Sequence, residues 1–477
     1  MSVARSIGPP VDLESFPTDL VLPEVKIASD GALMREIFQK YLRPSGTRTY
    51  QIQDCVLTRI RHRKAARCIL QYNLHLMDSE TGGKRIQWAT GVIYPSDRAK
   101  HIWRKLRASD LKADGAFQIL EPVSFIPELK MLVELFPYDH RLPAVKRMMT
   151  GPPSEIEALF LAQFGPGRWY TEARNVEPIR YRAGLAVVLQ YTVQARDKAT
   201  GRRSEKRFYA KIYRDEKGEE IYRILRALWE KGSVIGGRFT VGKPIAYLSE
   251  SRVLFQEGAL GISFQQILID GQDDEAVSAA RKVAMALAHL HLDNIPTTRR
   301  HLVQDEIAIL EEREKTLQWA CPDLKEEIEA VVRAVVANLQ EVPLRPAHLD
   351  LKTEHILIDG DRYAFLDFDS FALADPVLDA AQILAQIFAM QVRLAVPRDR
   401  SRMAAQAFTE EYFNHVPRDW RRRLSLQYAA AALGMAVGFF GRQETQWPEK
   451  VAALIEEAKA SLAGRVVWRD FSRPRWS

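Results

Sequence analysis

The chain repeats part of its own sequence, and this repeat fixes the order of its structural units. When Gln71 is placed on Gln190, a shift of 119 residues, the stretches around both positions run in parallel without a gap. A match that includes turn residues as well as apolar positions indicates a duplicated unit. The matched positions are Ile60-Arg61 with Ile179-Arg180, Leu70-Gln71-Tyr72 with Leu189-Gln190-Tyr191, Asp78, Thr81 and Gly82 with Asp197, Thr200 and Gly201, Ile93-Tyr94 with Ile212-Tyr213, Leu106-Arg107-Ala108 with Leu225-Arg226-Ala227, and, after three extra residues in the second copy, Pro122-Val123 with Pro244-Ile245.

Each copy is expected to form strands followed by a helix and a last strand. Residues 67–76 and 187–195 are apolar and rich in β-branched side chains, which is typical of strands. Each run ends at a turn that contains glycine, DSETGG in the first copy and DKATGR in the second. Amphipathic helices are predicted at 100–106 and 219–229, and last strands at 130–134 and 252–256.

The pattern becomes helical after residue 261. Helices are predicted at 276–292, across 305–341 with a break near Pro322, at 376–396 and over most of 401–463, with short hairpins at 348–373. The predicted organisation is an extended arm that leads into a short helix (1–45), a first β-rich lobe (46–150), a second β-rich lobe (151–259) and a large helical lobe (260–477), which is an α+β fold.

Composition excludes several classes of protein. Apolar residues are 47% and charged residues 27% of the 477, as in ordinary soluble domains. The net charge of +7 suits phosphate-bearing ligands, but no basic block exceeds three residues, so nucleic acid is not an expected partner. The three scattered cysteines fit neither a disulfide framework nor a zinc site, and they favour a reducing cytoplasm.

No membrane span or signal peptide is expected. The N-terminus lacks a basic region followed by an apolar core. Residues 424–441 carry no charge, but they are rich in alanine and contain Ser425, Gln427 and Tyr428. This composition favours a buried helix over a membrane helix.

Two carboxylates in the stretch HLDLKTEHILIDGDRYAFLDFDS (348–370) are candidates for phosphoryl transfer. Asp350 lies in a loop before a strand, where it can accept a proton from a hydroxyl nucleophile. Asp367 follows an apolar strand, where a carboxylate can bind a hard cation against phosphates. The alternative for each is a turn-forming aspartate. Asp369 is expected to be an outward turn residue, with a second metal ligand as the alternative.

Lys211 lies inside the apolar strand FYAKIY, where an ammonium group needs an anionic partner. Nucleotide phosphates are one candidate partner and Glu219 or Glu220 is another, while a lysine that reaches solvent at the strand edge is the alternative. Under the shift of 119, Lys211 meets Val92, and the two glutamates meet Lys100 and His101. The first copy thus lacks both partners, which favours a functional Lys211–Glu220 pair in the second copy alone.

Residues 348–379 resemble the aminoglycoside phosphotransferase and choline kinase family, which has a protein-kinase-like bilobal fold. That family has a His-x-Asp loop followed by Asn, then a metal-binding aspartate in an apolar strand, then a Gly-Asp-Pro…Asp element. The matching residues here are His348 and Asp350, Asp367-Phe368-Asp369, and Asp375-Pro376 with Asp379. Weaker matches are Leu290-His291 at a helix end and Val253-Leu254-Phe255-Gln256 at the interlobe hinge.

The resemblance implies a small antiparallel lobe and a large helical lobe, preceded by a degenerate copy of the small lobe. It implies that Asp350 is the catalytic base, that Asp367 binds magnesium, and that Lys211, paired with Glu220 or Glu219, contacts ATP phosphates. The backbone from Phe255 through Gln256 and Glu257 would receive adenine. Asp375 and Asp379 are expected to brace the loop rather than to take part in the chemistry.

Three departures from the family pattern affect these expectations. His355 stands where the family has Asn, and imidazole is a poor ligand for magnesium. His355 therefore has three interpretations: it bonds Asp350, it binds manganese as a metal ligand, or it marks lost activity. Only Gly184 lies between the first two strands of the second copy, so no glycine-rich nucleotide loop is visible. Lys211 and Glu220 are also unusually close in sequence for this fold.

The sequence therefore predicts an ATP-dependent, magnesium-using phosphotransferase that acts on a hydroxyl of a small molecule. The alternative is a nucleotide-binding pseudokinase, in which His355 impairs catalysis and residues 46–150 recruit a protein partner. The acceptor stays open. The acidic stretch 305–341 would attract a cationic substrate, although a solvated helix face is the plainer interpretation of it.

Overall fold

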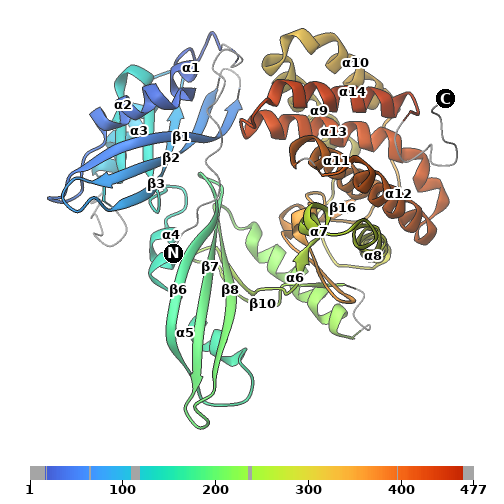
Figure 1. Cartoon of the computed structure of the whole chain (residues 1–477), viewed down its shortest axis with the longest axis horizontal. Helices are drawn as coiled ribbons and strands as arrows, with labels where there is room; N and C mark the ends of the chain where they lie inside the picture. The colour runs from blue at the N-terminus through green and yellow to red at the C-terminus, as the bar shows by residue number, and fades with distance from the viewer. Residues whose placement is uncertain are drawn as a thin grey trace.

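The computed structural model describes residues 17, 19–63, 66–108, 119–234, 239–394 and 396–465, except for the side chains of 232–234. Two β-sheets and one helical lobe make up the molecule, and Figure 1 shows them in blue, green and yellow to red. Each of these units is therefore formed largely by one continuous stretch of the chain. The small sheet followed by a large helical lobe confirms the predicted α+β, bilobal fold.

The first sheet contains five strands in the order β1-β2-β3-β5-β4, all antiparallel. Leu70, Tyr72 and Leu74 alternate toward the buried face of β2, as period-two patterning requires. The elements of this lobe are α1 (Glu24–Ser29), α2 (Gly31–Tyr41), β1 (Tyr50–Arg63), β2 (Arg67–Asp78), β3 (Lys84–Ile93), α3 (Arg98–Ala108), β4 (Val123–Ile126), η1 (Pro127–Leu129) and β5 (Met131–Leu135).

The second sheet has the equivalent order, β6-β7-β8-β11-β10. Its strands β6, β7 and β8 and its helix α6 each begin 119 residues after β1, β2, β3 and α3. This agreement extends the sequence match into backbone geometry. The elements are α4 (Ala144–Thr150), α5 (Ser154–Ala162), β6 (Trp169–Arg182), β7 (Ala186–Asp197), β8 (Arg203–Tyr213), α6 (Lys217–Val234), β10 (Pro244–Leu248) and β11 (Val253–Glu257).

Two predicted boundaries need correction. In place of an extended arm that leads into one short helix, two helices, α1 and α2, cover the first sheet, where Val25, Met34 and Phe38 are buried; residues 1–16 and 18 lie outside the described part. Helix α4 packs on the second sheet through Val145 and Met148. The second lobe therefore begins at α4 rather than at residue 151, because an apolar helix face belongs to the sheet that buries it.

The helical lobe follows the predicted order of helices, including the break at Pro322. Short strands that carry the candidate site are inserted before α11. Its elements are β9 (Thr240–Val241), β12 (Ile262–Ser263), α7 (Phe264–Asp270), α8 (Asp273–Leu292), α9 (Val303–Ala320), η2 (Pro322–Leu324), α10 (Lys325–Asn338), β13 (Arg345–Ala347), η3 (Thr353–His355), β14 (Ile356–Asp359), β15 (Arg362–Phe365), η4 (Phe368–Ser370), β16 (Ala372–Ala374), α11 (Val377–Leu394), α12 (Arg398–His415), η5 (Arg418–Arg423), α13 (Leu424–Gly441) and α14 (Trp447–Leu462).

Two helices are long and apolar enough to cross a membrane on length and composition alone, α11 and the segment Arg418–Gly441. Most of each window is buried inside the lobe, 61% and 56% respectively. Buried core helices have the same composition, so this finding is weak support for a span.

The first lobe shares a hydrophobic core with the helical lobe. Leu57 and Ile60 of β1 belong to the same buried cluster as Leu310 of α9 and Leu433 of α13. His62 stacks on Trp319 with ring centroids 3.9 Å apart. Figure 1 shows the end of β1 beside α13. The first lobe is therefore packed directly against the helices, which fixes its position relative to the candidate site.

The turn between β6 and β7 is bound by the first lobe. Asp139 accepts hydrogen bonds from the Gly184 N–H (2.7 Å) and the Tyr181 hydroxyl (3.0 Å). Gly184 has φ of +63°, a backbone conformation that glycine adopts readily. Ala183 packs into a cluster with Val92, the first-lobe counterpart of Lys211. The second lobe's turn thus covers the face of the first sheet that corresponds to its own cleft.

We predict that Asp139→Ala loosens this turn. The substitution leaves the Gly184 N–H without its buried acceptor, so unfolding free energy falls by about 1–3 kcal/mol. In hydrogen exchange, amides of residues 181–186 are expected to exchange at least ~10-fold faster. Asp361→Ala, at a hairpin turn where the side chain is 96% exposed, is the matched control. Unchanged exchange in the Asp139 variant would contradict the interaction.

Candidate active site

The loop after β13 is braced by one buried carboxylate. Asp379 of α11 accepts hydrogen bonds from the backbone N–H groups of His348 (2.6 Å) and Leu349 (2.7 Å). Burial alone raises the pKa of Asp379, but the bonds with His291 and His348 lower it overall. Leu349 has φ of +63°, which is unfavourable for a leucine. The two hydrogen bonds stabilise this conformation, as expected for a bracing residue.

Asp350 follows Leu349 and lies in a cavity of the helical lobe. Its Oδ2 accepts a hydrogen bond from Lys352 Nζ at 2.9 Å. The loop beyond it is fixed by Gln386, which accepts from Thr353 N–H (2.9 Å) and donates to the Leu351 carbonyl (2.8 Å). Asp350 is thus a positioned carboxylate with a neighbouring cation, which is a suitable arrangement for a proton acceptor beside a transferring phosphoryl group.

Asp367 lies between β15 and η4 with φ of +68°. Its carboxylate accepts a short hydrogen bond from Lys211 Nζ, and Arg180 Nη1 lies 3.4 Å from its Oδ2. Burial would raise the pKa of Asp367, but Lys211, His355 and Arg180 lower it far below its usual range. The carboxylate is therefore ionised at neutral pH and points into the cleft between the lobes.

Lys211 of β8 connects the two lobes. It contacts Asp367 and also lies 2.7 Å from Asp369 Oδ1. Burial lowers the pKa of Lys211, but the two aspartates raise it above its ordinary value. The Lys211–Asp367–Asp369 cluster therefore has a buried cation whose partners are two acids from the helical lobe.

The predicted Lys211–Glu220 pair is not formed. Glu220 instead accepts from the hydroxyls of Thr298 (3.1 Å) and Thr297 (3.4 Å). Glu219 lies 3.9 Å from Arg223 on its own helix. Helix α6 begins at Lys217, and its first turn directs Glu220 toward the loop before α9. Asp367 and Asp369 therefore pair with Lys211 in place of the glutamate that was predicted from the sequence.

Asp369 is not the outward turn residue that was expected. Its carboxylate accepts from the Tyr213 hydroxyl (3.0 Å) and lies 3.3 Å from Lys217 Nζ. The Arg299 guanidinium donates to its backbone carbonyl at 2.8 Å. Side-chain exposure is only 17%. The 3₁₀ turn of η4 directs Asp369 to the same cleft as Asp367.

The cleft contains a cavity of about 230 Å³ between β8, β11 and the Asp367 turn. Gln256 and Gly258 line it, whereas the Phe255 side chain is buried in the sheet core on the other face. The Glu257 carboxylate pairs with Lys206. The N–H groups of Glu257 and Gly258 donate to the carbonyls of Lys243 (2.8 Å) and Arg207 (2.9 Å). These two amides are thus engaged within the sheet.

His355 is buried beside Asp367, with Nε2 3.9 Å from Asp367 Oδ2. Burial first, then the neighbouring cations, lowers the pKa of His355 to about 3, so its ring is neutral near pH 7. Its Nδ1 has no hydrogen-bond partner among the described residues. The carboxylates of Asp367 and Asp369 fit a hard divalent cation. The neutral imidazole of His355 adds a nitrogen donor that suits manganese better than magnesium.

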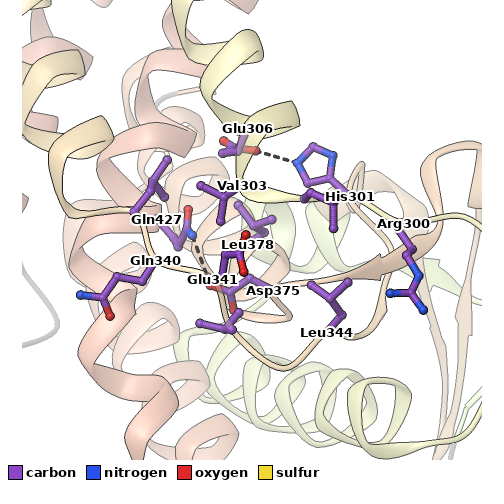
Figure 2. A pocket seen from close by; sticks show the side chains of 13 residues that line it. Arg300, His301, Val303, Glu306, Gln340, Glu341, Leu344, Asp375, Leu378 and Gln427 are labelled. Carbon is purple, nitrogen blue, oxygen red and sulfur yellow. Dashed lines mark hydrogen bonds and ion pairs between the residues drawn. The ribbon is translucent and has the colours of Figure 1, made fainter.

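Asp350 and Asp367 line neighbouring cavities, and Arg180 lines both. The cavity around Asp350 encloses about 470 Å³ and reaches α9, α11 and α13. Glu306, a buried acid in its wall, accepts from His301 Nε2 at 2.9 Å, as Figure 2 shows. One cavity therefore contains the Lys211–Asp367–Asp369 cluster, and the other contains the positioned carboxylate of Asp350.

Sequence reasoning did not assign roles to Arg180 or Lys352. Arg180 appears in the repeat as the partner of Arg61, and Lys352 follows Asp350 by two residues. The basic residues Arg180 and Arg182, just before the β6–β7 turn, were the available signal for Arg180. Arg180 contacts Asp367 from a segment that is far away in the sequence. Lys352 contacts Asp350 within a loop whose shape the sequence does not specify.

A model of the phosphotransferase enzyme family matches residues 190–426. No curated protein matches the chain. Similar solved structures include an ADP-bound aminoglycoside phosphotransferase, with 13% identity, a TM-score of 0.39 and coverage of 65% of this chain and 99% of that one.

A choline/ethanolamine kinase family protein from Mesorhizobium loti has 15% identity and a TM-score of 0.40, with coverage of 67% of this chain and 99% of that one. A choline kinase from Streptococcus pneumoniae has 14% identity and a TM-score of 0.38, with coverage of 65% and 100%. Through residues 190–426, the chain belongs to the phosphotransferase enzyme family.

Proposed function

We propose that this protein transfers the γ-phosphoryl group of ATP to a hydroxyl of a small molecule. The observation that carries the proposal is the Lys211–Asp367–Asp369 cluster at the interlobe cleft, next to a second cavity that contains Asp350. Buried charge clusters in clefts are typical of functional sites. In this proposal, β8 and the Asp367 turn bind the triphosphate, and the Asp350 cavity binds the acceptor.

The transfer requires one proton acceptor. The acceptor hydroxyl oxygen attacks the γ-phosphorus, a new oxygen–phosphorus bond forms, and the bond from the γ-phosphorus to the ADP oxygen breaks. Asp350 takes the hydroxyl proton. Lys352, which contacts Asp350, and Arg180, which lines both cavities, lie where they can contact phosphoryl oxygens. A divalent cation bound by Asp367 and Asp369 would neutralise phosphate charge.

A pseudokinase is the second candidate, and two observations favour it. His355 replaces an oxygen ligand with a buried neutral imidazole. The β6–β7 turn, which would cover a nucleotide, is bound by Asp139 of the first lobe. Under this alternative the cleft binds nucleotide without turnover, and the first lobe recruits a protein partner. Three unpaired, buried cysteines are consistent with a cytoplasmic location for either function.

We predict that Asp350→Asn abolishes catalysis without loss of nucleotide binding. Loss of the proton acceptor lowers ATP turnover by about 10²–10⁴-fold. Turnover is measured with magnesium and with manganese, in parallel with nucleotide affinity. Equal turnover in the wild type and the variant rejects the proposed role of Asp350. Nucleotide binding without turnover in the wild type supports the pseudokinase instead.

His355→Asn is expected to maintain or increase turnover with magnesium, because an amide oxygen suits this ion better than imidazole does. The ratio of manganese-supported to magnesium-supported turnover should fall. The measurement is a titration of each metal at fixed ATP. Complete loss of activity with both metals would show that the imidazole has a separate role.

Lys211→Met is expected to weaken nucleotide affinity by at least ~10-fold, since a charged hydrogen bond to phosphate contributes about 1.5–3 kcal/mol. Lys198→Met, an exposed lysine in the turn between β7 and β8, is the matched control. Affinity is measured by calorimetry with the non-hydrolysable ATP analogue AMP-PNP. Equal affinity for AMP-PNP in both variants would remove Lys211 from the site.

A further inference from the structure

The cavity around Asp350 has walls from every part of the chain. The first lobe contributes Arg59 of β1, and the second lobe contributes Arg180 and Arg182 of β6. The helical lobe contributes Asp350 and the faces of α9, α11 and α13. A cavity assembled from three lobes is complete only when the first lobe is in place.

Basic side chains predominate in this cavity. Seven basic residues and three acidic residues line it: Arg59, Arg180, Arg182, Arg313, Lys352, Arg393 and Arg442 against Glu306, Asp350 and Glu354. Of the acidic residues in the stretch 305–341, only Glu306 is part of the wall; Glu311 and Glu312 are exposed at the surface. The charge of the cavity is therefore opposite to what a cationic substrate requires.

Most of these basic groups have acidic neighbours. Arg393 and Arg442 both contact Glu444, at 2.8 and 2.9 Å. Arg313 lies 3.9 Å from Glu306, and Lys352 contacts Asp350. Among the described residues, the side chains of Arg59 and Arg182 have no ion pair.

Arg59 and Arg182 are held in proximity despite their like charges. Burial first, and then the charges of Arg182, Arg180, Arg61 and Arg442, lower the pKa of Arg59 to about 10. The Nε–H of Arg182 is buried and has no hydrogen-bond acceptor in the part of the chain that the structure describes. Partly buried guanidinium groups without an anion are unfavourable, and planar oxyanions satisfy them with paired hydrogen bonds.

Helix α13 is shaped to admit the arginines. A Cβ atom at Gly434 would lie 3.1 Å from the Arg313 guanidinium carbon, and one at Gly438 would lie 3.1 Å from Arg442 Nη1. These glycines are one helical turn apart and lie in the cavity wall. The glycines in the charge-free segment thus give the guanidinium groups space against the helix.

The first lobe fixes Arg59 at this wall. The Ile60 carbonyl lies 3.5 Å from where a Cβ of Gly441 would lie, so β1 and α13 are in close contact. His62, two residues farther along β1, stacks on Trp319 of α9. Arg59 is therefore positioned by contacts on its own strand, and its partner-free side chain faces the cavity shared with Arg182.

We propose that the phosphoryl acceptor is an anionic small molecule, bearing a phosphate or a carboxylate beside its hydroxyl, and that Arg59 of the first lobe and Arg182 of the second bind this anion. The proposal rests on the proposed function and names the acceptor's chemical class. It also gives the first lobe a role, because that lobe supplies one of the two anion-binding side chains. The hydroxyl of the acceptor binds beside Asp350, which takes its proton as the γ-phosphoryl group is transferred.

The test compares four hydroxylated probes of similar size: glycerol 3-phosphate, glycerate, glycerol and choline. Affinities are measured by calorimetry on the full chain in the presence of AMP-PNP and magnesium. At least one anionic probe is expected to bind ~10-fold or more tightly than glycerol and choline, and to weaken as salt increases. The two anionic probes distinguish a phosphate from a carboxylate ligand.

The double variant Arg59→Gln/Arg182→Gln is expected to lose at least ~10-fold in anion affinity, and affinity for AMP-PNP should not change. Arg85→Gln, an exposed arginine on β3 of the first lobe, is the matched control. Without probe, the melting temperature of Arg59→Gln should be equal to or above that of the wild type, because repulsion among the arginines decreases. If the Arg59→Gln substitution caused misfolding, the melting temperature would instead fall below that of the wild type.

Three results would overturn the inference: choline or glycerol binds as tightly as the anionic probes, the double variant retains full anion affinity, or it loses affinity for AMP-PNP instead. The last result would assign the arginines to the nucleotide. Arginine-dependent anion binding in a protein without ATP turnover would support the anion site of Arg59 and Arg182 and reject the proposed function, and with it the role of the anion as phosphoryl acceptor. The two failures are therefore distinguishable.

Discussion

The contact of Lys211 with Asp367 and Asp369 is the interaction on which the rest of the site depends. One cation on β8 lies against two acids from a single turn of the helical lobe, and all three side chains are largely buried. Buried like charges repel unless a cation lies between them. The cluster thereby connects the two lobes at the cleft, and it sets the distance between the second sheet and the Asp350 loop that Asp379 braces.

The first lobe is a copy of the second in strand order, but it lacks the counterpart of Lys211. Val92 occupies the position of Lys211, and the β6–β7 turn packs on it through Ala183. An apolar residue in place of the lysine suits a face that another segment covers. The copy has thus become a packing partner that binds the second lobe's turn, shares a core with the helices and places Arg59 in the cavity around Asp350.

Much of the fold was predictable because its determinants are local. Strand alternation, glycine turns and the 119-residue shift located most elements, and the break at Pro322 divided two helices as expected. The Asp367 position was also predictable, since a carboxylate directly after an apolar strand carries a strong local signal. One short helix was expected after the arm, but the prolines before residue 24 concealed α1, whose stability comes from packing on the sheet.

The partners of the site residues were not predictable. Lys211 and Asp369 are distant in sequence, and the direction of the Asp369 side chain depends on a single 3₁₀ turn. Arg59 and Arg182 line one cavity only because the folded chain brings β1 and β6 to it. The most direct test of the account is hydrogen exchange with and without ATP and magnesium. The account predicts protection at residues 209–213 and 365–370 and none at 67–93; protection of 67–93, or none at the cleft, would contradict it.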